Sequence, residues 1–369
     1  MRIGLVIGML ARGGAELQLI TLARGLAARG HDVRVLAYDG ASEFDDDVRS
    51  VGAEVETATA RTRPEKRRVV RHWLRRSQCD VVHAFMNLAS SLTILARFPA
   101  RRPAIVATDY STATYQRHDL LLRTALASFV LAQRVVTESE LNRENLERLV
   151  PWLRGKTVVI RNGLDPERFA PAERDRPADD VFRFCVVGTV HAVKNPSGVV
   201  DAIVELVRRG HHGFHVDWYG RMGGEPNGHE GERARAYAIS SGVARFITFH
   251  GASSRVERAY QGADALLHAA LSEGFPNAVA EGMACGLPVA LSRISDLPLV
   301  VAEARNGFTF DERDPAAIAD AMEQMMRVPP AERRAMGRRS RDVALKWFSI
   351  DRFLDEHESL YRALVGSRS

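Results

Sequence analysis

The sequence predicts an α/β protein built from two doubly wound parallel-sheet domains. Short apolar runs rich in β-branched residues alternate with segments of helical period along almost the whole chain. Such alternation is typical of parallel sheets that are covered by helices on both faces. The chain has 369 residues, more than the about 250–300 at which a single hydrophobic core stops growing.

The order of the expected elements separates the two domains. A helix over residues 16–28, ended by Gly30, follows the first strand, and a segment rich in proline and acidic residues over 165–181 is typical of a linker. We therefore expect one domain over residues 1–170, a second over 171–348, and a helix over 349–369 that completes the second domain or crosses back to the first. The strands are expected at residues 3–7, 33–37, 81–84, 104–108, 135–137, 158–160, 182–187, 216–219, 247–249, 265–267 and 288–291.

The composition indicates the cellular compartment of the protein and argues against some kinds of structural site. The three cysteines, Cys79, Cys185 and Cys285, are far apart, which argues against a disulfide framework and against a structural zinc site. The N-terminus lacks the pattern of a signal peptide, and no run of about 18 uncharged apolar residues occurs. We expect a cytoplasmic protein without a structural zinc site.

Basic residues are concentrated in the N-terminal half. Residues 61–134 hold 14 Lys and Arg against four Asp and Glu, although the net charge of the whole chain is only +5. The segment 61–76 combines this charge with Val69, Val70, Trp73 and Leu74. Two interpretations remain open: an amphipathic helix on an anionic membrane surface, or a solvated helix whose apolar face packs on the sheet. We expect no nucleic-acid partner, because the chain contains no recognisable nucleic-acid module.

The most informative segment is residues 272–289, which follow a predicted strand. A helix is expected to start at Pro276-Asn277 and to end at Gly286. Glu273 then precedes the helix and Glu281 lies about one turn inside it. A helix N-terminus offers free N–H groups and a positive dipole to a diphosphate, and carboxylates beside it suit sugar hydroxyls.

This segment resembles the E-x7-E motif of the retaining glycosyltransferases of family 4, which have the GT-B fold of two Rossmann-like domains facing a cleft. The resemblance implies a nucleoside-diphosphate-sugar donor. It implies that Glu273 contacts the transferred sugar near the reaction centre and that Glu281 holds the ribose. It also implies that backbone groups of Gly274, Phe275, Pro276 and Asn277 contact the donor. Lys194 is expected to face the two carboxylates across a gap as wide as a pyrophosphate.

A second candidate site is the segment 187–195, which ends the first strand of the second domain. Gly188 and Thr189 precede Lys194, which suits the neutralisation of a departing diphosphate. Family members often carry an arginine where Thr189 stands, and His191 or Arg221 is the candidate substitute for that charge. The segment ending in Gly251 resembles the strand end that lines the nucleobase pocket of the family.

Fewer residues support the prediction of an acceptor-binding site. Gly13 and Gly14, between Arg12 and Glu16, resemble the family's Gly-Gly-x-Glu loop, although a tight turn that needs glycine for its φ angle alone explains them equally well. Asp109 follows a predicted strand. It is interpreted as an acceptor base, as a ligand of a cationic or polyol acceptor, or as the cap of the next helix.

The resemblance implies a metal-independent, retaining hexosyltransferase, for which we expect no metal and no cofactor. It would act on a glycan or lipid-linked acceptor in bacterial cell-surface polysaccharide or glycolipid synthesis, with a possible site of action at the inner face of the plasma membrane. Two alternatives stay open: a GT-B nucleotide-sugar epimerase or hydrolase, and a catalytically inactive nucleotide-sugar-binding protein. The inactive binding protein stays an alternative because Thr189 stands where family members often carry an arginine.

Overall fold

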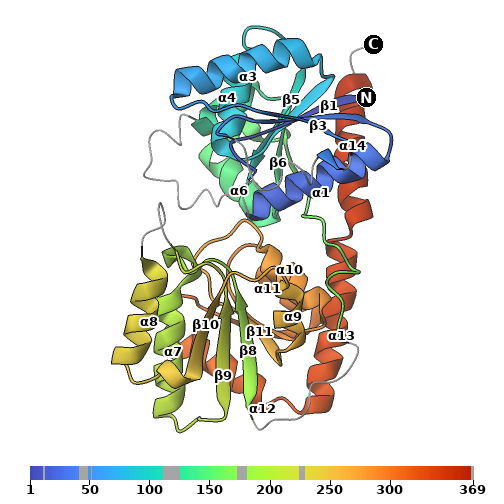
Figure 1. Ribbon diagram of the computed structural model, residues 1–369. Helices are drawn as coiled ribbons and strands as arrows, with labels where there is room; N and C mark the ends of the chain where they lie inside the picture. The colour runs from blue at the N-terminus through green and yellow to red at the C-terminus, as the bar shows by residue number, and fades with distance from the viewer. Residues whose placement is uncertain are drawn as a thin grey trace. The chain divides into compact units, whose positions relative to one another are not determined.

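The computed structural model describes residues 1–10, 13–40, 49–50, 52–110, 125–172, 181–223 and 229–366. The chain forms two compact units (Figure 1). Unit 1 comprises Met1–Gly163 and Ile350–Ser369, and unit 2 comprises Leu164–Ser349. Residues 164–170, assigned to the first domain from the sequence, lie with unit 2. The part of the predicted linker over 173–180 lies outside the described residues.

Unit 1 is built on a seven-stranded, fully parallel sheet of order β3-β2-β1-β4-β5-β6-β7. Ile3, Leu5 and Ile7 of β1 point to one core cluster and Val6 to the other, as expected for a sheet buried on both faces. The strands are β1 (Arg2–Ile7), β2 (Asp32–Ala37), β3 (Glu54–Thr57), β4 (Val81–Ala84), β5 (Ala104–Asp109), β6 (Arg134–Thr137) and β7 (Thr157–Val159).

Helices cover this sheet on both faces (Figure 1). They are α1 (Gly14–Ala28), α3 (Arg63–Ser77), α4 (Asn87–Arg97), α6 (Glu140–Leu149) and α14 (Ile350–Gly366), with 3-10 turns η1 (Phe129–Leu131) and η2 (Pro151–Leu153). Thr62 and Glu65 form a capping box that starts α3. Val70, Trp73 and Leu74 of α3 are buried in the core, so this helix packs its apolar face on the sheet and does not offer it to a lipid.

The C-terminal helix α14 completes unit 1. It packs on α1, where Gly25 leaves room for Leu354, because a Cβ at residue 25 would lie 2.4 Å from that side chain. Its Tyr361 hydroxyl lies 2.6 Å from His83 Nδ1 on β4, and His83 Nε2 lies 2.6 Å from the Thr108 hydroxyl. This buried polar contact fixes the position of α14 over the sheet, since buried polar groups need their partners.

Unit 2 is built on a six-stranded parallel sheet of order β10-β9-β8-β11-β12-β13. Its strands are β8 (Phe182–Val187), β9 (Phe214–Tyr219), β10 (Ile247–Gly251), β11 (Ala265–His268), β12 (Val289–Ser292) and β13 (Gly307–Phe310). Its helices are α7 (Pro196–Arg208), α8 (Glu230–Ser240), α9 (Val256–Gln261), α10 (Asn277–Ala284), α11 (Leu297–Ala304), α12 (Pro315–Arg327) and α13 (Pro330–Trp347), with η3 (Ala192–Lys194) and η4 (Ala244–Phe246).

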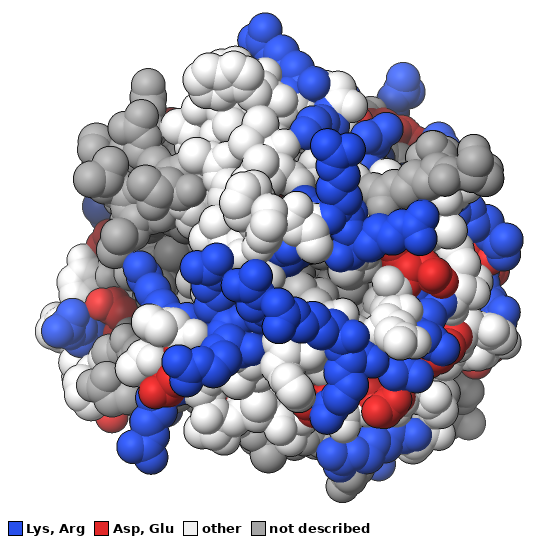
Figure 2. All heavy atoms as spheres, turned by 90° about the horizontal axis from the view of Figure 1, so that it is seen from above, with Lys and Arg blue, Asp and Glu red and all other residues white. Residues whose placement is uncertain are grey.

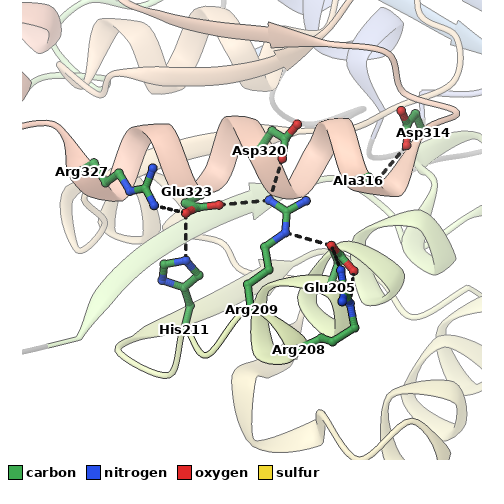
Figure 3. A network of polar contacts seen from close by, with 9 residues as sticks. All are labelled: Glu205, Arg208, Arg209, His211, Asp314, Ala316, Asp320, Glu323 and Arg327. Atoms are coloured by element: carbon green, nitrogen blue, oxygen red, sulfur yellow. Dashed lines mark hydrogen bonds and ion pairs between the residues drawn. The ribbon is translucent and has the colours of Figure 1, made fainter.

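An ion-pair network ties α7 to α12 on the surface of unit 2 (Figure 3). Arg209 follows α7 and lies 2.8 Å from Glu205, 2.6 Å from Asp320 and 3.0 Å from Glu323. His211 also contacts Glu323, at 3.0 Å. Because one guanidinium serves three carboxylates, the network orients α12 against α7, although exposed pairs of this kind contribute only about 0–1 kcal/mol each.

The predicted fold class is confirmed, and the strands predicted from the sequence begin and end within two residues of the observed ones. Two observed strands, β3 and β13, were not predicted. Glu54–Thr57 carries two glutamates, and Gly307–Phe310 is only four residues long and begins with glycine. Both lie at an edge of their sheet, where strands are short and polar and where the apolar pattern is weakest.

The buried histidines predict how stability depends on pH. Burial lowers the pKa of His357 to about 4, while its Nδ1 donates to the Phe353 carbonyl at 2.8 Å. The unfolded chain takes up this proton near pH 6.5, so the stability that His357 contributes is complete above that pH and is lost as the pH falls towards 4. We expect a loss of about 2 kcal/mol from this residue between about pH 7 and pH 5.

Urea unfolding of the wild type and of His357→Leu at the two pH values tests this expectation. The variant should lose less stability on acidification than the wild type, by about 2 kcal/mol. Equal losses would mean that His357 does not titrate differently in the folded and unfolded chains.

Candidate functional site

The candidate site in unit 2 lies at the carboxyl ends of β8 and β11. These neighbouring strands mark the point where the strand order reverses, since β9 lies on one side of β8 and β11 on the other. Open parallel sheets bind ligands in the crevice at such a point. The loops after β8 and β11 carry Lys194 and Glu273, respectively.

Local sequence places Lys194 at the end of the β8–α7 loop. His191 caps the short turn η3, accepting from the Val193 N–H at 3.3 Å. Asn195, at φ 57°, accepts from the Gly198 N–H at 3.2 Å and starts α7 ahead of Pro196. Lys194 is the last residue of η3 and lies directly before the cap of α7, so both capped elements fix its backbone.

The β11–α10 loop brings Glu273 to the same place. The Leu271 N–H donates to the Val193 carbonyl at 2.8 Å, which joins this loop to the one that carries Lys194. The Lys194 ammonium forms an ion pair with the Glu273 carboxylate, and both side chains are only partly exposed. The two residues are therefore brought together directly, and not across a gap as wide as a pyrophosphate.

His268 is a site residue that the sequence reasoning missed. It ends β11, is 3% exposed, and its Nε2 lies 4.0 Å from Glu273 Oε1. Neither ring nitrogen has a hydrogen-bond partner within the described part of the chain. Burial, helped by the positive charge of Lys194, lowers the pKa of this imidazole well below its usual value, so it is neutral near pH 7. The signal in the sequence was a polar residue at the carboxyl end of a buried strand.

Glu281 lies within α10, as expected, and its side chain is buried. It is 9% exposed, and its Oε2 accepts a hydrogen bond from the Tyr260 hydroxyl at 2.9 Å. Burial raises the pKa of this carboxyl, and the hydrogen bond from Tyr260 opposes that rise. The carboxylate is thus tied to α9 in the core and does not meet Lys194. No pattern in the sequence pointed to Tyr260.

The residues between the two glutamates form the start of α10. The Gly274 carbonyl accepts from the Ser295 hydroxyl, and the Phe275 ring is buried, 4.8 Å from the ring of Phe348. Pro276 precedes the first turn of α10, and Asn277 begins it. The first two residues of the helix are partly buried. The Phe275 ring therefore serves packing, while the N-terminal end of α10 lies close to Glu273 in the sequence.

Glycines allow a close approach of two strands beside Lys194. Gly188 has φ 148°, and a Cβ on Gly220 would lie 1.9 Å from the Gly188 carbonyl oxygen. The Gly220 N–H in turn donates to the Gly251 carbonyl at 2.8 Å, where β10 ends. Thr189 lies beside Gly188 in this loop, and the Val190 N–H that follows it donates to the Arg221 carbonyl at 2.8 Å. Gly188, Thr189, Arg221 and Gly251 therefore adjoin one another.

In unit 1 the predicted residues lie at the carboxyl ends of β1 and β5. Gly13 caps α1 at φ −144°, so its φ angle does not require glycine; a Cβ there would instead displace the Glu16 carboxylate, 2.2 Å away. Gly14 begins α1, and Arg12 lies outside the described residues. Asp109 ends β5 fully buried, and its carbonyl accepts from Asn142 at 3.0 Å.

A hollow of about 350 Å³ opens at the same edge of the unit 1 sheet. It lies where β1 and β4 mark the reversal of strand order in this sheet. The sequence reasoning identified none of its lining residues, because most are apolar and resemble core positions. They are Gly8, Tyr38, Asp39, Phe85, Met86, Asn87, Leu88, Ala89 and Tyr110.

The residue types at these candidate sites suit the binding of anions and polyols. In unit 2 a cation, a carboxylate and the N–H groups of a helix end adjoin one another, which suits a phosphate group next to a sugar. The described residues contain no group of three or more His, Cys, Asp or Glu side chains placed to hold a metal ion. Among these residues, too, no helix has the length and apolarity that crossing a lipid bilayer requires.

Two known families match most of the chain. The family described as glycosyltransferase family 4 matches residues 12–168, and the family described as glycosyl transferases group 1 matches residues 171–343. The chain belongs to glycosyltransferase family 4, with a group 1 domain as its C-terminal part. The resemblance found in residues 272–289 is thereby confirmed.

The curated relatives are distant. A D-inositol 3-phosphate glycosyltransferase of Saccharomonospora viridis is 28% identical over 249 residues, covering 64% of this chain and 57% of the relative. The enzyme of that name from Mycolicibacterium smegmatis is 26% identical over 228 residues, covering 58% and 50%. The chain thus spans about half the length of the curated relatives it matches.

Solved structures share the fold over its full length. HepE of Anabaena in complex with UDP and glucose has a TM-score of 0.84 at 17% identity, covering 98% of this chain and 100% of that one. A sucrose-phosphate synthase of Thermosynechococcus elongatus has a TM-score of 0.85 at 19% identity, covering 99% of both chains. The GT-B fold of two Rossmann-like units is therefore confirmed.

The buried hydrogen bond to Glu281 gives a prediction for stability. Tyr260→Phe should destabilise unit 2 by about 2 kcal/mol at neutral pH, because a charged or partly charged carboxylate loses its donor in the core. Tyr237→Phe is the matched control, since Tyr237 donates to Asp201 at the surface. Its cost should stay within about 0.5 kcal/mol.

Urea or thermal unfolding of the two variants measures the difference. Equal costs for Tyr260→Phe and Tyr237→Phe would contradict the placement of Glu281 in the core.

Proposed function

We propose that the protein is a retaining glycosyltransferase that moves a sugar from a nucleoside-diphosphate sugar to a hydroxyl of a glycan or lipid-linked acceptor. The observation that carries the proposal is the ion pair of Lys194 with Glu273 beside the N-terminal end of α10. The name of a neighbour that was solved with UDP and glucose supports the choice of donor.

In the proposed reaction the bond between the sugar's anomeric carbon and the diphosphate oxygen breaks, and its electron pair leaves with the diphosphate. Lys194 and the positive end of the α10 helix dipole neutralise the charge that develops on that oxygen. The acceptor oxygen forms the new bond from the same face of the sugar, and its proton passes to the departing phosphate oxygen. Glu273 orients the hydroxyls of the sugar.

The proposal includes no divalent metal and no cofactor. A cation and a helix end placed at one phosphate supply the charge stabilisation that a metal supplies in other transferases. Transfer that is unchanged by EDTA would support this part of the proposal, and transfer that needs an added divalent ion would overturn it.

The acceptor is proposed to bind unit 1. Its hollow combines the aromatic side chains Tyr38, Phe85 and Tyr110 with the carboxylate of Asp39, a combination that suits the apolar face and the hydroxyls of a sugar ring. Asp109 lies at the end of β5, one residue before Tyr110, and is proposed to bind a hydroxyl of the acceptor. A role in cell-surface polysaccharide or glycolipid synthesis is supported by structural neighbours named for lipopolysaccharide biosynthesis.

Two alternatives make different predictions for the same site. A GT-B epimerase or hydrolase would consume the donor without any acceptor. A catalytically inactive binding protein would bind the donor without turnover, and Glu273→Ala would then change affinity alone. Donor consumption measured with and without acceptor extracts separates both alternatives from a transferase.

The donor class is testable by thermal shift. A panel of UDP, GDP, ADP and dTDP sugars should give one clear rise in melting temperature, because a ligand of the folded state stabilises it. A protein that responds to no member of the panel would contradict the proposed donor class.

The responding sugar then serves in a transfer assay. Lys194→Met should lower kcat by about 100-fold or more, the scale seen when one charge-stabilising group is removed. Lys346→Met is the matched control, since Lys346 pairs with Glu303 on the surface of unit 2 and should leave kcat unchanged. A full kcat in Lys194→Met would overturn the role of Lys194.

An anionic membrane surface is the proposed place of action, at the inner face of the plasma membrane. The apolar face of α3 is used in the core, so the exposed basic side chains of the helix, Arg63, Arg67, Arg68, Arg75 and Arg76, carry this part of the proposal. Basic clusters next to a bilayer favour acidic lipids by about 1 kcal/mol per charge.

Co-sedimentation with vesicles tests the surface. The protein should bind vesicles that contain anionic lipid and not neutral ones, and about 0.5 M salt should release it. Equal binding to both kinds of vesicle, or binding to neither, would remove the membrane from the proposal.

A further inference from the structure

A second hollow, of about 390 Å³, lies on the surface of unit 1 between α3 and the end of α4. Its volume is in the range of about 300–1,000 Å³ that holds small ligands. Four of its eight lining residues are arginines, and none is acidic. The lining residues are Arg71, Leu74, Arg75, Ala96, Arg97, Pro99, Ala100 and Arg102.

The charges of this arginine hollow are not balanced by the protein. Arg71 and Arg75 are four residues apart on α3, where like charges repel each other. Within the described part of the chain, Arg71, Arg75 and Arg102 have neither an ion pair nor a hydrogen bond. The segment 81–108, which supplies the other wall, contains no Asp or Glu.

The nearby carboxylates are engaged elsewhere. Glu65 accepts from the backbone N–H groups of Arg61 and Thr62, and Glu56 pairs with Arg76. Asp80 accepts from the Arg2 N–H at 2.8 Å. The repulsion among the arginines is therefore left for a ligand to relieve. Figure 2 shows this end of unit 1, on which Lys and Arg side chains gather with few Asp and Glu among them.

The walls of the hollow are already held in place. Arg97 donates to the Leu131 carbonyl at 2.9 Å and to the Arg101 carbonyl at 3.2 Å. Arg67 donates to the Leu95 carbonyl at 3.1 Å, which ties α3 to α4 beside the hollow. A ligand would meet a largely formed site, which reduces the entropy lost on binding.

We propose that the arginine hollow is a binding site for a phosphate group. Guanidinium groups match a phosphate through paired N–H donors and keep their charge at any physiological pH. The phosphate belongs either to a lipid headgroup or to a soluble phosphorylated molecule. The inference deepens the anionic-surface part of the proposed function and rests on it only for the lipid source.

Two exposed apolar side chains at the rim of the arginine hollow concern the source of the phosphate group. Phe98 and Leu95 are 55% and 41% exposed, and they flank Arg97 at the end of α4. Exposed apolar side chains next to the arginines of the hollow suit the boundary between headgroups and acyl chains of a bilayer. Vesicle binding and binding of free phosphate are therefore measured separately.

The first arm of the test uses inorganic phosphate and no lipid. Binding is followed by the ³¹P line width for the wild type, for Arg71→Gln/Arg102→Gln in the hollow, and for Arg63→Gln/Arg68→Gln on the exposed face of α3. Both double variants remove two positive charges from unit 1. The hollow variant should bind phosphate at least about tenfold more weakly, while the control should change less than about twofold. Equal weakening in both would mean general attraction, and the site would be rejected.

The second arm uses vesicles of phosphatidic acid or of phosphatidylglycerol at equal surface charge. A lipid source predicts that the wild type prefers phosphatidic acid and that the hollow variant loses this preference while the control keeps it. Phosphate binding in the first arm without any such preference assigns the site to a soluble ligand. Absence of both responses overturns the proposal.

Two controls keep the outcomes separate. Melting temperatures of both double variants should stay within a few degrees of the wild type, or rise in the hollow variant because a repulsive pair is removed. The thermal shift by the donor sugar, which reports on unit 2, should be the same in all three proteins. Absence of a donor response in all three proteins, with phosphate binding intact in the wild type, would count against the transferase and not against the hollow.

Discussion

The structure of the candidate site depends on the ion pair between Lys194 and Glu273. The two residues come from loops after β8 and β11, and the backbone hydrogen bond from Leu271 to Val193 holds those loops together. Each charge is balanced by the other, which makes the partly buried position of both side chains tolerable. The proposed diphosphate would therefore compete with Glu273 for Lys194, with the helix end of α10 as its second proposed partner.

The candidate sites of the two units lie at corresponding places in their sheets. Each sheet reverses its strand order once near its centre, and each carries a candidate site at the carboxyl ends of the strands beside that reversal. In unit 2 the loops provide charge, and in unit 1 they provide aromatic side chains and a carboxylate. The arginine hollow lies away from this edge, between helices, so its chemistry is separate from that of either site.

The fold was predictable because apolar, β-branched strands alternate with amphipathic helices, and that pattern needs no knowledge of tertiary contacts. The position of Lys194 and Glu273 followed from the same pattern together with the motif. The hydrogen bond between Tyr260 and Glu281 was not predictable, because the two residues are 21 positions apart and no pattern in the sequence links them. His268 was missed because a histidine inside an apolar run resembles a core residue. The hollows were invisible for a similar reason, because segments distant in the sequence form their walls.

The most direct test of the account is the affinity of Glu273→Gln for a nucleoside diphosphate without its sugar. The amide keeps the size of the side chain but releases Lys194 from its ion pair, so the variant should bind the diphosphate more tightly than the wild type and transfer sugar more slowly. Calorimetric titration of both proteins with the diphosphate of the responding donor measures the first effect. A variant that binds the diphosphate more weakly than the wild type would contradict the claim that Glu273 and the diphosphate compete for Lys194.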